Sequence, residues 1–584
     1  MKTVTPLIIA ASLLGSGSAA YAQPAHQDNS RSCPGDNGGI TVSPGFCATI
    51  FADKLGHVRQ MAVAPNGVLY VNTWSGVYYN NEPPPPGGFL IALQDTNHDG
   101  QADKIVRFGP TFADGDHGGT GIAIYKNYVY AETNDRIVRY ALPSTGIAPT
   151  GTAETIVSGM PLGGDHPMHP FEIDAHGNMY VDMGTATNAC QSENRMPNVP
   201  GENPCHELET RGGTWLFNAD ELNQHFSPVE RFATGIRNGE GISFDSAGRI
   251  FVTQHGRDQL WQNWPQLYSM ADGENEPAEE LVQLRKGADY GWPECYYDYQ
   301  QKKLVLAPEY GGDGGRTVGV CAQKQEPVAA FPAHWAPDDM KIYEGDQFPA
   351  AYKDGAFLAF HGSWNRAPGP QGGYNVVFQP LADGKASGPF VVFANGFAGP
   401  LKEPGRALHR PTGLAVGPHG SLYISDDIGG RIWRVTYVGD RAVSAIAPSA
   451  PTPPVEQTAA SANVLPPEGI HANAGRMLPI PPGGSPDQVA LGDRIFHGQA
   501  AGGTCSGCHG ADGRGTAIGA DLVAGKWLWS NGSVQGLMHI IEVGVPQAKE
   551  HIGGMPPGGG ARLSEADLAA VADYVWAISH MPKH

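Results

Sequence analysis

The sequence predicts an all-β domain, a six-bladed β-propeller, followed by a small all-α domain. One hairpin pattern recurs six times, at irregular spacing, between residues 61 and 424. The 584 residues include 79 Gly and 49 Pro, and only 16% are charged, a composition typical of turn-rich β proteins. The composition changes after Val443, and helical patterns appear only beyond that point. A chain of this length is too long for a single core, so at least two domains are expected.

The N-terminus has the pattern of an export signal over residues 1–22. Lys2 supplies a positive charge, residues 7–14 are apolar, and Ala20-Tyr21-Ala22 is a cleavage site of the A-x-A type. The apolar stretch is too short to span a bilayer, and no other segment is long enough. We therefore expect a periplasmic protein without a membrane span; an uncleaved N-terminal anchor is the alternative. The net charge of −20 argues against nucleic acid or an anionic membrane surface as a partner.

The repeats define the propeller, predicted over residues 23–443. Each repeat is a short apolar strand, a polar turn with Gly, and a second strand that ends in an aromatic residue, which is a hairpin pattern. Strong copies span residues 61–71, 171–181, 242–252 and 413–424, and weaker copies span residues 121–131 and 356–363. Six copies favour a six-bladed propeller over a β-sandwich or two smaller β domains.

Six cysteines lie in the propeller region, and an exported protein can oxidise them. Six cysteines allow fifteen pairings. Because they fall in three neighbouring couples along the chain, we expect the disulfides Cys33–Cys47, Cys190–Cys205 and Cys295–Cys321. Each would close a surface loop and stabilise the fold by constraining the unfolded chain.

Residues 95–103 carry oxygen side chains around a Gly turn. Asp95, Asn97, Asp99 and Asp103 have the alternating arrangement of a structural Ca²⁺ loop, although Val106 at position 12 excludes an EF-hand. The alternative is an Asx-rich turn without an ion. The role is structural in either case.

Beyond the propeller, residues 444–484 are rich in Pro, Ala and Ser, which predicts a semi-rigid linker. The following domain, predicted over residues 485–584, contains Cys505-Ser506-Gly507-Cys508-His509. C-x-x-C-H is the attachment signature of one c-type haem (heme c). Cys505 and Cys508 would bind its vinyl groups, and His509 would face the iron. A zinc site is the alternative, but no other Cys lies near.

The surrounding sequence is similar to class I cytochrome c. A helix is expected over residues 487–496, and a second amphipathic helix after the capped start at Ser564. Gly492, Phe496 and Tyr574 lie where that family packs its first helix against its last.

Met555 is the candidate for the second axial ligand of the haem iron. It lies in Gly553-Gly554-Met555-Pro556-Pro557, a Pro-bounded loop of the kind that carries this ligand in the family, and the fixed φ of Pro would stiffen it. Met538, Met581 and His551 are alternatives. Methionine ligation would raise the redox potential.

Six segments in order on the repeat framework carry a further resemblance. They are Gly163-Gly164-Asp165-His166, Gly235-Ile236-Arg237-Asn238-Gly239-Glu240-Gly241, Thr253-Gln254-His255-Gly256-Arg257-Asp258, Gly287-Ala288-Asp289-Tyr290-Gly291-Trp292-Pro293, His361-Gly362-Ser363-Trp364-Asn365-Arg366 and His409-Arg410-Pro411-Thr412-Gly413. On these segments the chain resembles the soluble sugar dehydrogenases that depend on pyrroloquinoline quinone (PQQ), especially the aldose and L-sorbosone branch. The resemblance implies a catalytic base, PQQ, and a Ca²⁺ that holds and polarises the quinone.

The base implied by the resemblance is His166, which would take the hydroxyl proton of the substrate as hydride moves to the quinone. His169 is a nearby alternative. Arg237 and Asn238 match a pair that contacts the reactive oxygen and carboxylates of PQQ, which makes Arg237 catalytic as well as cofactor-binding.

Other matches concern the carboxylates of PQQ and the calcium ion. Arg410 matches a further arginine, and Arg366 falls beside a position where the glucose enzymes have Lys. Gly256 and Arg257 match the two residues whose backbone carbonyls bind Ca²⁺.

Three residues depart from the glucose enzymes. Thr185 replaces an Asp that supports the catalytic His, Thr412 replaces a second Arg, and Asn365 replaces a Lys. These departures argue against glucose itself as the substrate.

We therefore expect an exported quinohaemoprotein oxidoreductase. It would oxidise a sugar, or a related alcohol or aldehyde, at PQQ and pass electrons to its own haem, then to a downstream cytochrome or a terminal oxidase. A linker would keep this acceptor close to the propeller. One alternative is a non-catalytic binding propeller tethered to a cytochrome. The other is a Ca²⁺-dependent lactonase, for which Glu172, Asn188 and Asp245 are candidate ligands.

Overall fold

The computed structural model describes most of the two predicted domains. The described residues are 1, 33, 35–73, 86–111, 118–366, 370–400, 402, 407–440, 446–449, 478–503, 505–510, 512–515, 519–545, 549 and 554–581. Apart from Met1, the export signal predicted at residues 1–22 lies outside them, as does most of the predicted linker. Among the described residues, no helix is long and apolar enough to cross a membrane.

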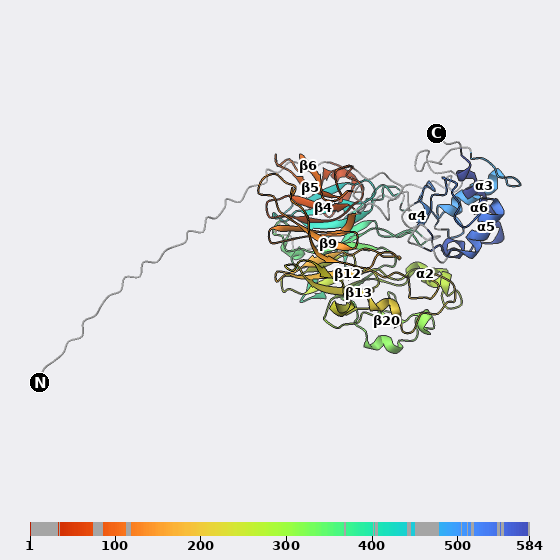
Figure 1. Cartoon of the computed structure of the whole chain (residues 1–584), viewed down its shortest axis with the longest axis horizontal. Helices are drawn as coiled ribbons and strands as arrows, with labels where there is room; N and C mark the ends of the chain where they lie inside the picture. Colours follow the sequence, from red (N-terminus) through yellow and green to blue (C-terminus); the bar gives the residue numbers. More distant parts are fainter. Residues whose placement is uncertain are drawn as a thin grey trace. The chain divides into compact units, whose positions relative to one another are not determined.

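Six antiparallel sheets of four or five strands make up the described part of residues 41–437 (Figure 1). Each sheet is given from its inner to its outer strand. The first sheet contains β3 (Val58–Val63), β4 (Leu69–Thr73), β5 (Leu90–Gln94) and β6 (Lys104–Phe108), and the second contains β7 (Gly118–Tyr125), β8 (Tyr128–Thr133), β9 (Arg136–Ala141) and β10 (Glu154–Ser158), with the short parallel β14 (Gln224–His225). The third sheet contains β11 (Phe171–Ile173), β12 (Asn178–Met183), β13 (Gly213–Asn218) and β15 (Arg231–Thr234). The fourth sheet contains β16 (Ile242–Phe244), β17 (Ile250–Gln254), β18 (Glu279–Gln283) and β21 (Ala329–Phe331). The fifth contains β22 (Pro337–Ile342), β23 (Ala356–Phe360), β24 (Asn375–Gln379), β27 (Val391–Asn395) and β1 (Thr41–Val42). The sixth contains β28 (Pro411–Val416), β29 (Leu422–Asp426), β30 (Ile432–Tyr437) and β2 (Phe46–Ala52).

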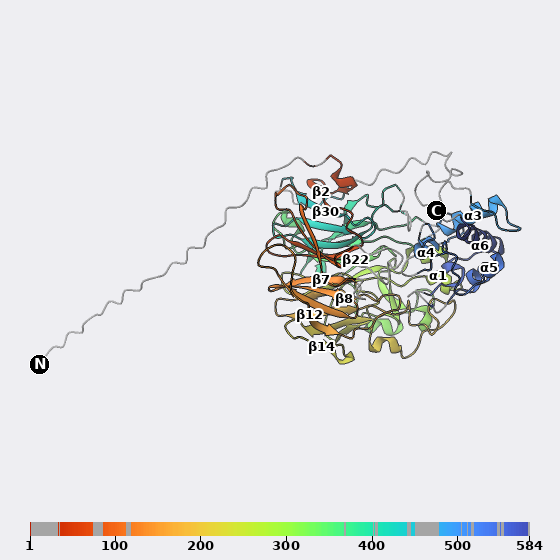
Figure 2. The same ribbon diagram turned by 45° about the horizontal axis from the view of Figure 1, so that its top comes forward.

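The six sheets close into a ring. Each inner strand contacts the next, in the order β3, β7, β11, β16, β22 and β28, and β28 contacts β3 again. The last sheet is completed by the N-terminal strand β2, which pairs with the C-terminal strand β30 from Phe46 opposite Tyr437 (Figure 2). Phe46 is buried, and its ring centre lies 4.7 Å from those of Phe348 and Phe393. Pairing the first and last parts of the propeller in one sheet closes the ring of blades. The predicted six-bladed propeller is therefore confirmed.

The repeated hairpins form because their turn glycines accept a left-handed backbone. In the turn between β3 and β4, Gly67 has a φ of 83°, and the amide of Ala64 donates to the carbonyl of Val68 over 2.9 Å. The copies near residues 177, 248 and 420 have the same glycine conformation. The hairpin predicted at residues 356–363 is wrong in one respect: residues 356–360 are β23, and its hairpin partner β22 precedes it.

All three predicted disulfides are present, Cys33–Cys47, Cys190–Cys205 and Cys295–Cys321. Cys190–Cys205 closes a loop within the long connection from β12 to β13. Cys295–Cys321 closes the excursion that carries the ribbon β19 (Cys295–Asp298) and β20 (Lys303–Leu306). A second ribbon pairs β25 (Leu381–Ala382) with β26 (Lys385–Ala386). Two short helices, α1 (Leu260–Asn263) and α2 (Met270–Asn275), lie between β17 and β18.

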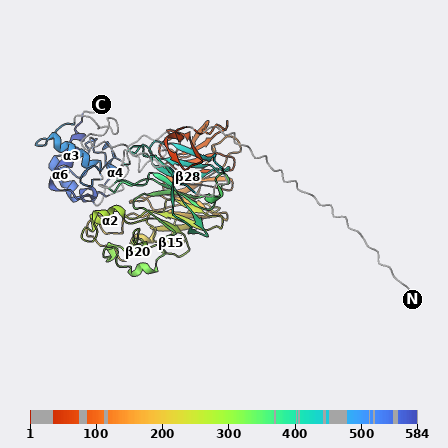
Figure 3. The same cartoon turned by 180° about the vertical axis from the view of Figure 1, so that it is seen from behind.

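The C-terminal domain is helical, with α3 (Pro486–Phe496), α4 (Cys505–His509), α5 (Val534–Val543) and α6 (Glu565–Ser579). Helices α3 and α6 lie side by side (Figure 3). A Cβ on Gly492 would lie 2.0 Å from the carbonyl oxygen of Ala570, so only glycine permits this approach. Phe496 packs on Tyr574 with ring centres 5.2 Å apart, and Ser564 caps α6. Both predicted helices are confirmed.

The blade topology places five of the six resemblance segments on one face of the propeller. Because strands alternate in direction, the connections that enter an inner strand and those that leave the second strand of a blade lie at the same end. Residues 159–170, 235–241 and 407–410 enter inner strands, whereas residues 184–212, 255–278 and 361–374 leave second strands.

Candidate functional site

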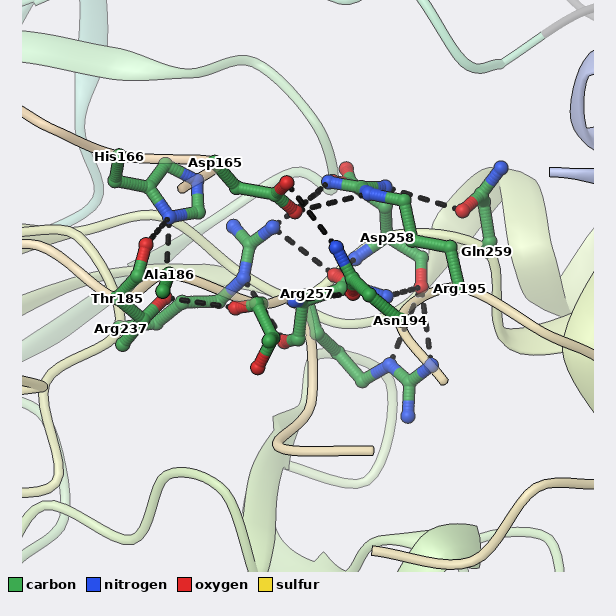
Figure 4. A network of polar contacts seen from close by, with 12 residues as sticks. Asp165, His166, Thr185, Ala186, Asn194, Arg195, Arg237, Arg257, Asp258 and Gln259 are labelled. Carbon is green, nitrogen blue, oxygen red and sulfur yellow. Dashed lines mark hydrogen bonds and ion pairs between the residues drawn. The ribbon is translucent and has the colours of Figure 1, made fainter. Parts of the chain in front are cut away.

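Loops of this face line one cavity. Among its lining residues are His166 and Asp165, Arg195, Arg237, His255 with Gly256, Asp258 and Gln259, Glu279, His334, and Trp364 with Asn365. Figure 4 shows how the polar side chains of its wall join. Seven stretches of the chain, around residues 165, 195, 237, 255–259, 279, 334 and 364, therefore contribute to one polar pocket.

Hydrogen bonds at one ring nitrogen of His166 determine which of its two nitrogens is basic. It is 9% exposed, and its Nδ1 lies 3.0 Å from the carbonyl oxygen of Thr185 and 3.1 Å from the Thr185 hydroxyl. That hydroxyl donates to the carbonyl of Thr187 over 2.8 Å, so its oxygen is left to accept. Nδ1 therefore carries the proton and donates it to Thr185, which leaves Nε2 as the basic nitrogen. Thr185 thus supplies the support that the glucose enzymes take from Asp.

Electrostatics keep His166 neutral. Burial lowers its pKa well below the ordinary imidazole value, and the charges of Arg237, His255 and Arg195 lower it further, while Asp258 opposes them. A neutral imidazole is the form that can accept a proton.

Both ring nitrogens of the alternative base, His169, lie within hydrogen-bond distance of protein oxygens. Its Nδ1 lies 3.1 Å from the Glu132 carboxylate, and its Nε2 lies 3.0 Å from the carbonyl oxygen of Pro161. It is 1% exposed and does not line the cavity. The geometry therefore favours His166 over His169.

Arg237 lies in the cavity wall with all its nitrogens bonded. Nε donates to the carbonyl of Asn188, Nη1 to the carbonyl of Gly256 over 2.9 Å, and Nη2 to the side chains of Asn188 and Asp258. Asn188 is in turn held by the backbone amide of Asp258. The guanidinium is 3% exposed and its orientation is fixed from three sides.

Asp258 joins several parts of the site. Oδ2 accepts from Arg237 over 2.9 Å and from Arg195 over 3.0 Å, and Oδ1 accepts from Asn365 over 2.7 Å. Burial alone would raise the pKa of Asp258, but the two guanidinium groups lower it below the ordinary range. Asp258 is therefore ionised throughout the neutral pH range.

The predicted calcium residues lie beside a buried carboxyl group. Gly256 lines the cavity, and its amide donates to Glu279 over 2.9 Å. Burial raises the pKa of Glu279 to about 8. The side chain of Arg257 turns away, to the carboxylate of Glu309, so only its backbone is available for a cation. In this structure Arg237 Nη1 donates to the carbonyl of Gly256, so a cation at that oxygen would use its second lone pair and lie close to the guanidinium.

The wall fits a planar anionic quinone with a cation. Trp364 supplies an aromatic face, and Arg195 and Arg237 supply positive charge. The buried Oδ1 of Asn365 has no partner among the described residues and can accept from a ligand N–H. Asp165 and Asp258 already neutralise the two arginines. A tricarboxylate would therefore bring three unbalanced negative charges, and a bound divalent cation would offset two of them.

Four cofactor residues predicted from the resemblance do not line the cavity, and one of them is Arg257, whose side chain turns to Glu309. Arg366 donates to the backbone carbonyls of Glu274, Ala333 and Pro370. Arg410 donates to the carbonyls of His361 and Gly362, and Asn238 donates to Glu240 over 3.4 Å. Among residues that depart from the glucose enzymes, Asn365 lines the cavity, whereas Thr412 bonds the carbonyl of Val58 between strands.

The turn at residues 95–103 satisfies its carboxylates without an ion. Asp95 accepts from the amides of Asp99 and Gly100, Asp99 accepts from the amide of Gln101, and Asp103 accepts from Thr96. Among the described residues, no group of three His, Cys, Asp or Glu side chains is arranged to hold a metal ion. The structure therefore favours the Asx-rich turn over the calcium loop.

The lactonase ligands are not brought together. Glu172 pairs with Lys341, and Asp245 pairs with Arg249 in a hairpin turn. Of the three candidates only Asn188 bonds residues of the cavity wall, and it bonds an arginine rather than carboxylates.

A second, apolar cavity lies in the C-terminal domain. Cys505, Cys508 and His509 of α4 line it together with Met555 and Trp527. Nδ1 of His509 lies 2.9 Å from the carbonyl oxygen of Ala520, which orients the ring at this cavity. The three disulfides do not involve Cys505 or Cys508. The residue types and their grouping fit one covalently bound haem.

Met555 is held at this cavity by its backbone. It forms a two-way bridge with Val545, with N···O distances of 2.6 and 2.8 Å. Neither Met538 nor Met581 lines the cavity, and Met538 packs against the helix core. His551 lies outside the described residues. The geometry therefore favours Met555 among the described candidates.

Comparison with known proteins places most of the chain in one family. The TrAA12-like family matches residues 40–438, which is more than half of the chain. The chain belongs to this family. Residues 488–575 match the family described as cytochrome C oxidase, cbb3-type, subunit III, in agreement with a C-terminal cytochrome c domain.

Relatives of this TrAA12-like chain include a pyrroloquinoline quinone-dependent pyranose dehydrogenase of Coprinopsis cinerea. It is 30% identical over 257 residues, which are 37% of this chain and 33% of the relative. The chain thus spans about a third of that relative's length.

Two solved structures show the same fold. The PQQ domain of the Coprinopsis cinerea pyranose dehydrogenase is 20% identical with a TM-score of 0.53, covering 68% of this chain and 97% of that one. A Trichoderma reesei enzyme of family AA12 is 18% identical with a TM-score of 0.54, covering 68% and 98%, and a calcium structure of the same enzyme also matches. These likenesses establish the propeller fold of the TrAA12-like domain.

Several wall residues were not singled out from the sequence. Asp165, His255 and Asp258 lie inside quoted segments but were given no role. His334 and Arg195 lie outside every segment, and the only sequence signal near Arg195 is the cysteine pair that brackets it.

Proposed function

We propose that this protein oxidises a sugar CH–OH group at PQQ and delivers the electrons to its own c-type haem. The observation that carries the proposal is the His166 site: a buried, neutral imidazole with its basic nitrogen selected by Thr185, on the wall of a cavity that also presents Arg237 and Trp364. A PQQ-dependent relative and a cytochrome domain on the same chain support it.

The residues divide the work of the oxidation. Converting CH–OH to C=O removes two electrons and two protons. His166 Nε2 takes the hydroxyl proton. Arg237 holds carboxylate or quinone oxygens, and Asp258 fixes its orientation. Bound PQQ would supply the acceptor for the remaining proton and both electrons, which leave together as hydride from the C–H bond, and Ca²⁺ would polarise it.

A haem fits the second half of the reaction because it accepts electrons singly. Cys505 and Cys508 would hold it, with His509 and Met555 as iron ligands. Electrons would leave to a downstream cytochrome or a terminal oxidase.

Export to the periplasm completes the proposal. The leader pattern at residues 1–22 supports it, and three disulfides are typical of an oxidising compartment. Thr185 and Asn365 stand where the glucose enzymes have other residues, which supports a sugar other than glucose.

The test uses the exported, haem-loaded protein in its oxidised form, incubated with PQQ and Ca²⁺. Aldoses, sorbosone and simple alcohols are added in turn while the α-band of the reduced haem is recorded. Reduction that needs both PQQ and one of these substrates supports the proposal and names the substrate. No reduction with any substrate, together with loss of all PQQ on dialysis, refutes it.

A further inference from the structure

The connection from β12 to β13 holds an arginine in an unusual backbone conformation. Arg195 has a φ of 62°, a left-handed conformation that is uncommon outside glycine. It lies inside the loop closed by Cys190–Cys205. The buried side chain of Gln191 braces this loop, since it donates to the carbonyls of Met196 and Val199 and accepts from the amide of Arg195 over 3.1 Å. These contacts therefore hold the loop in the backbone conformation that sets the direction of the Arg195 side chain.

That side chain reaches three partners outside its own loop (Figure 4). Nε donates to Asp165 over 2.9 Å, Nη2 donates to Asp258 over 3.0 Å, and Nη1 donates to Gln259 over 3.1 Å. Its neighbour Asn194 also donates to Asp165, over 3.2 Å. The guanidinium is 11% exposed and lies in the cavity wall.

These partners belong to the two halves of the proposed reaction centre. Asp165 directly precedes the base His166. Asp258 holds Arg237 and directly follows Arg257, one of the two predicted calcium residues. One guanidinium therefore ties the segment of the base to the segment of the cofactor and its cation.

We propose that Arg195 is a positioning residue, which holds His166 and the Arg237–Asp258 pair at a fixed separation for the reaction. This inference rests on the proposed function. Arg195 acts through Asp165 and Asp258 and need not touch the substrate. A displacement of about 1 Å in such a geometry can lower the turnover rate by about 100-fold.

Arginine suits this role better than lysine. Its planar group offers five N–H donors in fixed directions, so it can bridge three acceptors at once, whereas an ammonium group is a point charge on a flexible stem. Arg195 also adds to the positive field at His166. The groups that face His166 are Arg237, His255 and Arg195, which disfavour its protonation, and Asp258, which favours it.

The test compares Arg195→Gln and Arg195→Lys with the wild-type holoprotein. For Arg195→Gln we expect kcat to fall about 10- to 100-fold with KM changed less than about 3-fold. The acid limb of kcat/KM should move to higher pH, because the lost charge no longer opposes protonation of His166. Arg195→Lys should keep the limb near its wild-type position but still lose kcat.

A second readout does not depend on turnover. The affinity for PQQ in the presence of Ca²⁺ and the absence of sugar is measured by quenching of tryptophan fluorescence, since Trp364 lines the cavity. Arg195→Gln should weaken it about 10-fold or more, because Asp258 loses one of its two cationic partners. The matched control is Arg249→Gln, a half-buried arginine that pairs with Asp245 in a hairpin turn.

The disulfides provide an independent comparison. Replacing both Cys190 and Cys205 by Ser should reproduce part of the loss in kcat, because the loop then holds Arg195 less firmly. Replacing both Cys295 and Cys321 by Ser should leave the acid limb in place. If Arg195→Gln does not fold, the kinetics of Arg195→Lys and of the Cys190/Cys205 double variant decide whether Arg195 is a positioning residue.

The outcomes separate this inference from the function it rests on. If Arg195→Gln lowers only the melting temperature and leaves kcat, the acid limb and the PQQ affinity unchanged, Arg195 is structural and the inference is wrong. If the wild-type protein oxidises no sugar and binds no PQQ, the proposed function itself fails.

Discussion

At the scale of single residues, the proposed chemistry depends on which nitrogen of His166 carries the proton. The carbonyl and hydroxyl oxygens of Thr185 accept the hydrogen bond from Nδ1–H, and burial with nearby cations holds the ring neutral. The sequence showed Thr185 only as a departure from a related family. Its role became visible when the structure placed its hydroxyl 3.1 Å from the imidazole.

Replacing His166 by Gln should lower kcat by at least about 100-fold, because the variant loses the imidazole that accepts the substrate proton in the proposed reaction. PQQ binding should remain, since Arg237 is unchanged. In the wild type, the lowered pKa of His166 means that the neutral base persists as pH falls, so kcat/KM should decline only below the ordinary imidazole pKa. A pH profile with its acid limb above that value would contradict this assignment.

Thr185 can be tested with a pair of matched variants. Thr185→Val removes the hydroxyl and keeps the shape, so Nδ1 retains only the carbonyl, and we expect kcat to fall about 10-fold. Thr185→Ser keeps the hydroxyl and should stay within about 3-fold of the wild type. Equal losses in steady-state kcat for both variants would show that packing of the methyl group, rather than the hydrogen bond, is what matters.

At the scale of the elements, the propeller strands carry buried carboxyl groups outside the site. Glu280 of β18 is 3% exposed, and its Oε1 accepts from Gln254 over 3.1 Å. Its Oε2 has no partner among the described residues. Burial raises the pKa of Glu280 to about 8, so the folded state favours the protonated form.

This predicts a pH-dependent stability. Because the folded pKa lies above the unfolded one, the contribution of Glu280 is complete below the ordinary Glu pKa and is lost as pH rises through 8. Glu280→Gln should therefore raise the free energy of unfolding at pH 8 by about 1–3 kcal/mol and change it little at pH 4. Urea unfolding at both pH values measures this, with the exposed Glu154→Gln as a control. A variant that is less stable at pH 8 would contradict the assignment.

The elements also show where sequence reasoning succeeds. Five of the six hairpins, the two outer helices of the haem domain and the three disulfides depend on local patterns or on neighbouring residues, and these predictions are confirmed. The blade at residues 337–395 was located one strand too late because its first strand lacks the repeat pattern.

The site was harder to predict because it depends on contacts between distant loops. His166 and Gly256 came from motifs that the chain retains. Arg195 donates to Asp258, which lies 63 residues further along the chain, and no sequence motif in either segment predicts this contact. Arg366 and Arg410 matched by position, but their side chains bond loop carbonyls instead of facing the cavity.

At the scale of the whole molecule, one chain combines a TrAA12-like propeller with a cytochrome c domain. In the proposed function, the propeller would hold the site of two-electron chemistry, and the cytochrome domain would hold the one-electron acceptor. Carrying both on one polypeptide keeps the acceptor at a high effective concentration, whatever the amount of protein present.

The haem ligand is tested by Met555→Ala. Loss of a thioether ligand should lower the haem midpoint potential and abolish the absorption band characteristic of Met-to-iron ligation. Met538→Ala serves as the control, because Met538 packs in the helix core outside the haem cavity. An unchanged potential in Met555→Ala with a changed one in Met538→Ala would reverse the assignment.

The central claim is that sugar oxidation in the propeller reduces the haem of the same chain. The most direct measurement is anaerobic stopped-flow of the oxidised protein, loaded with PQQ and Ca²⁺, mixed with its sugar at several protein concentrations. The account predicts that the haem α-band appears with a first-order rate that does not change with protein concentration, and that His166→Gln loses this phase. A rate that rises in proportion to protein concentration, or haem reduction that needs no PQQ, would contradict it.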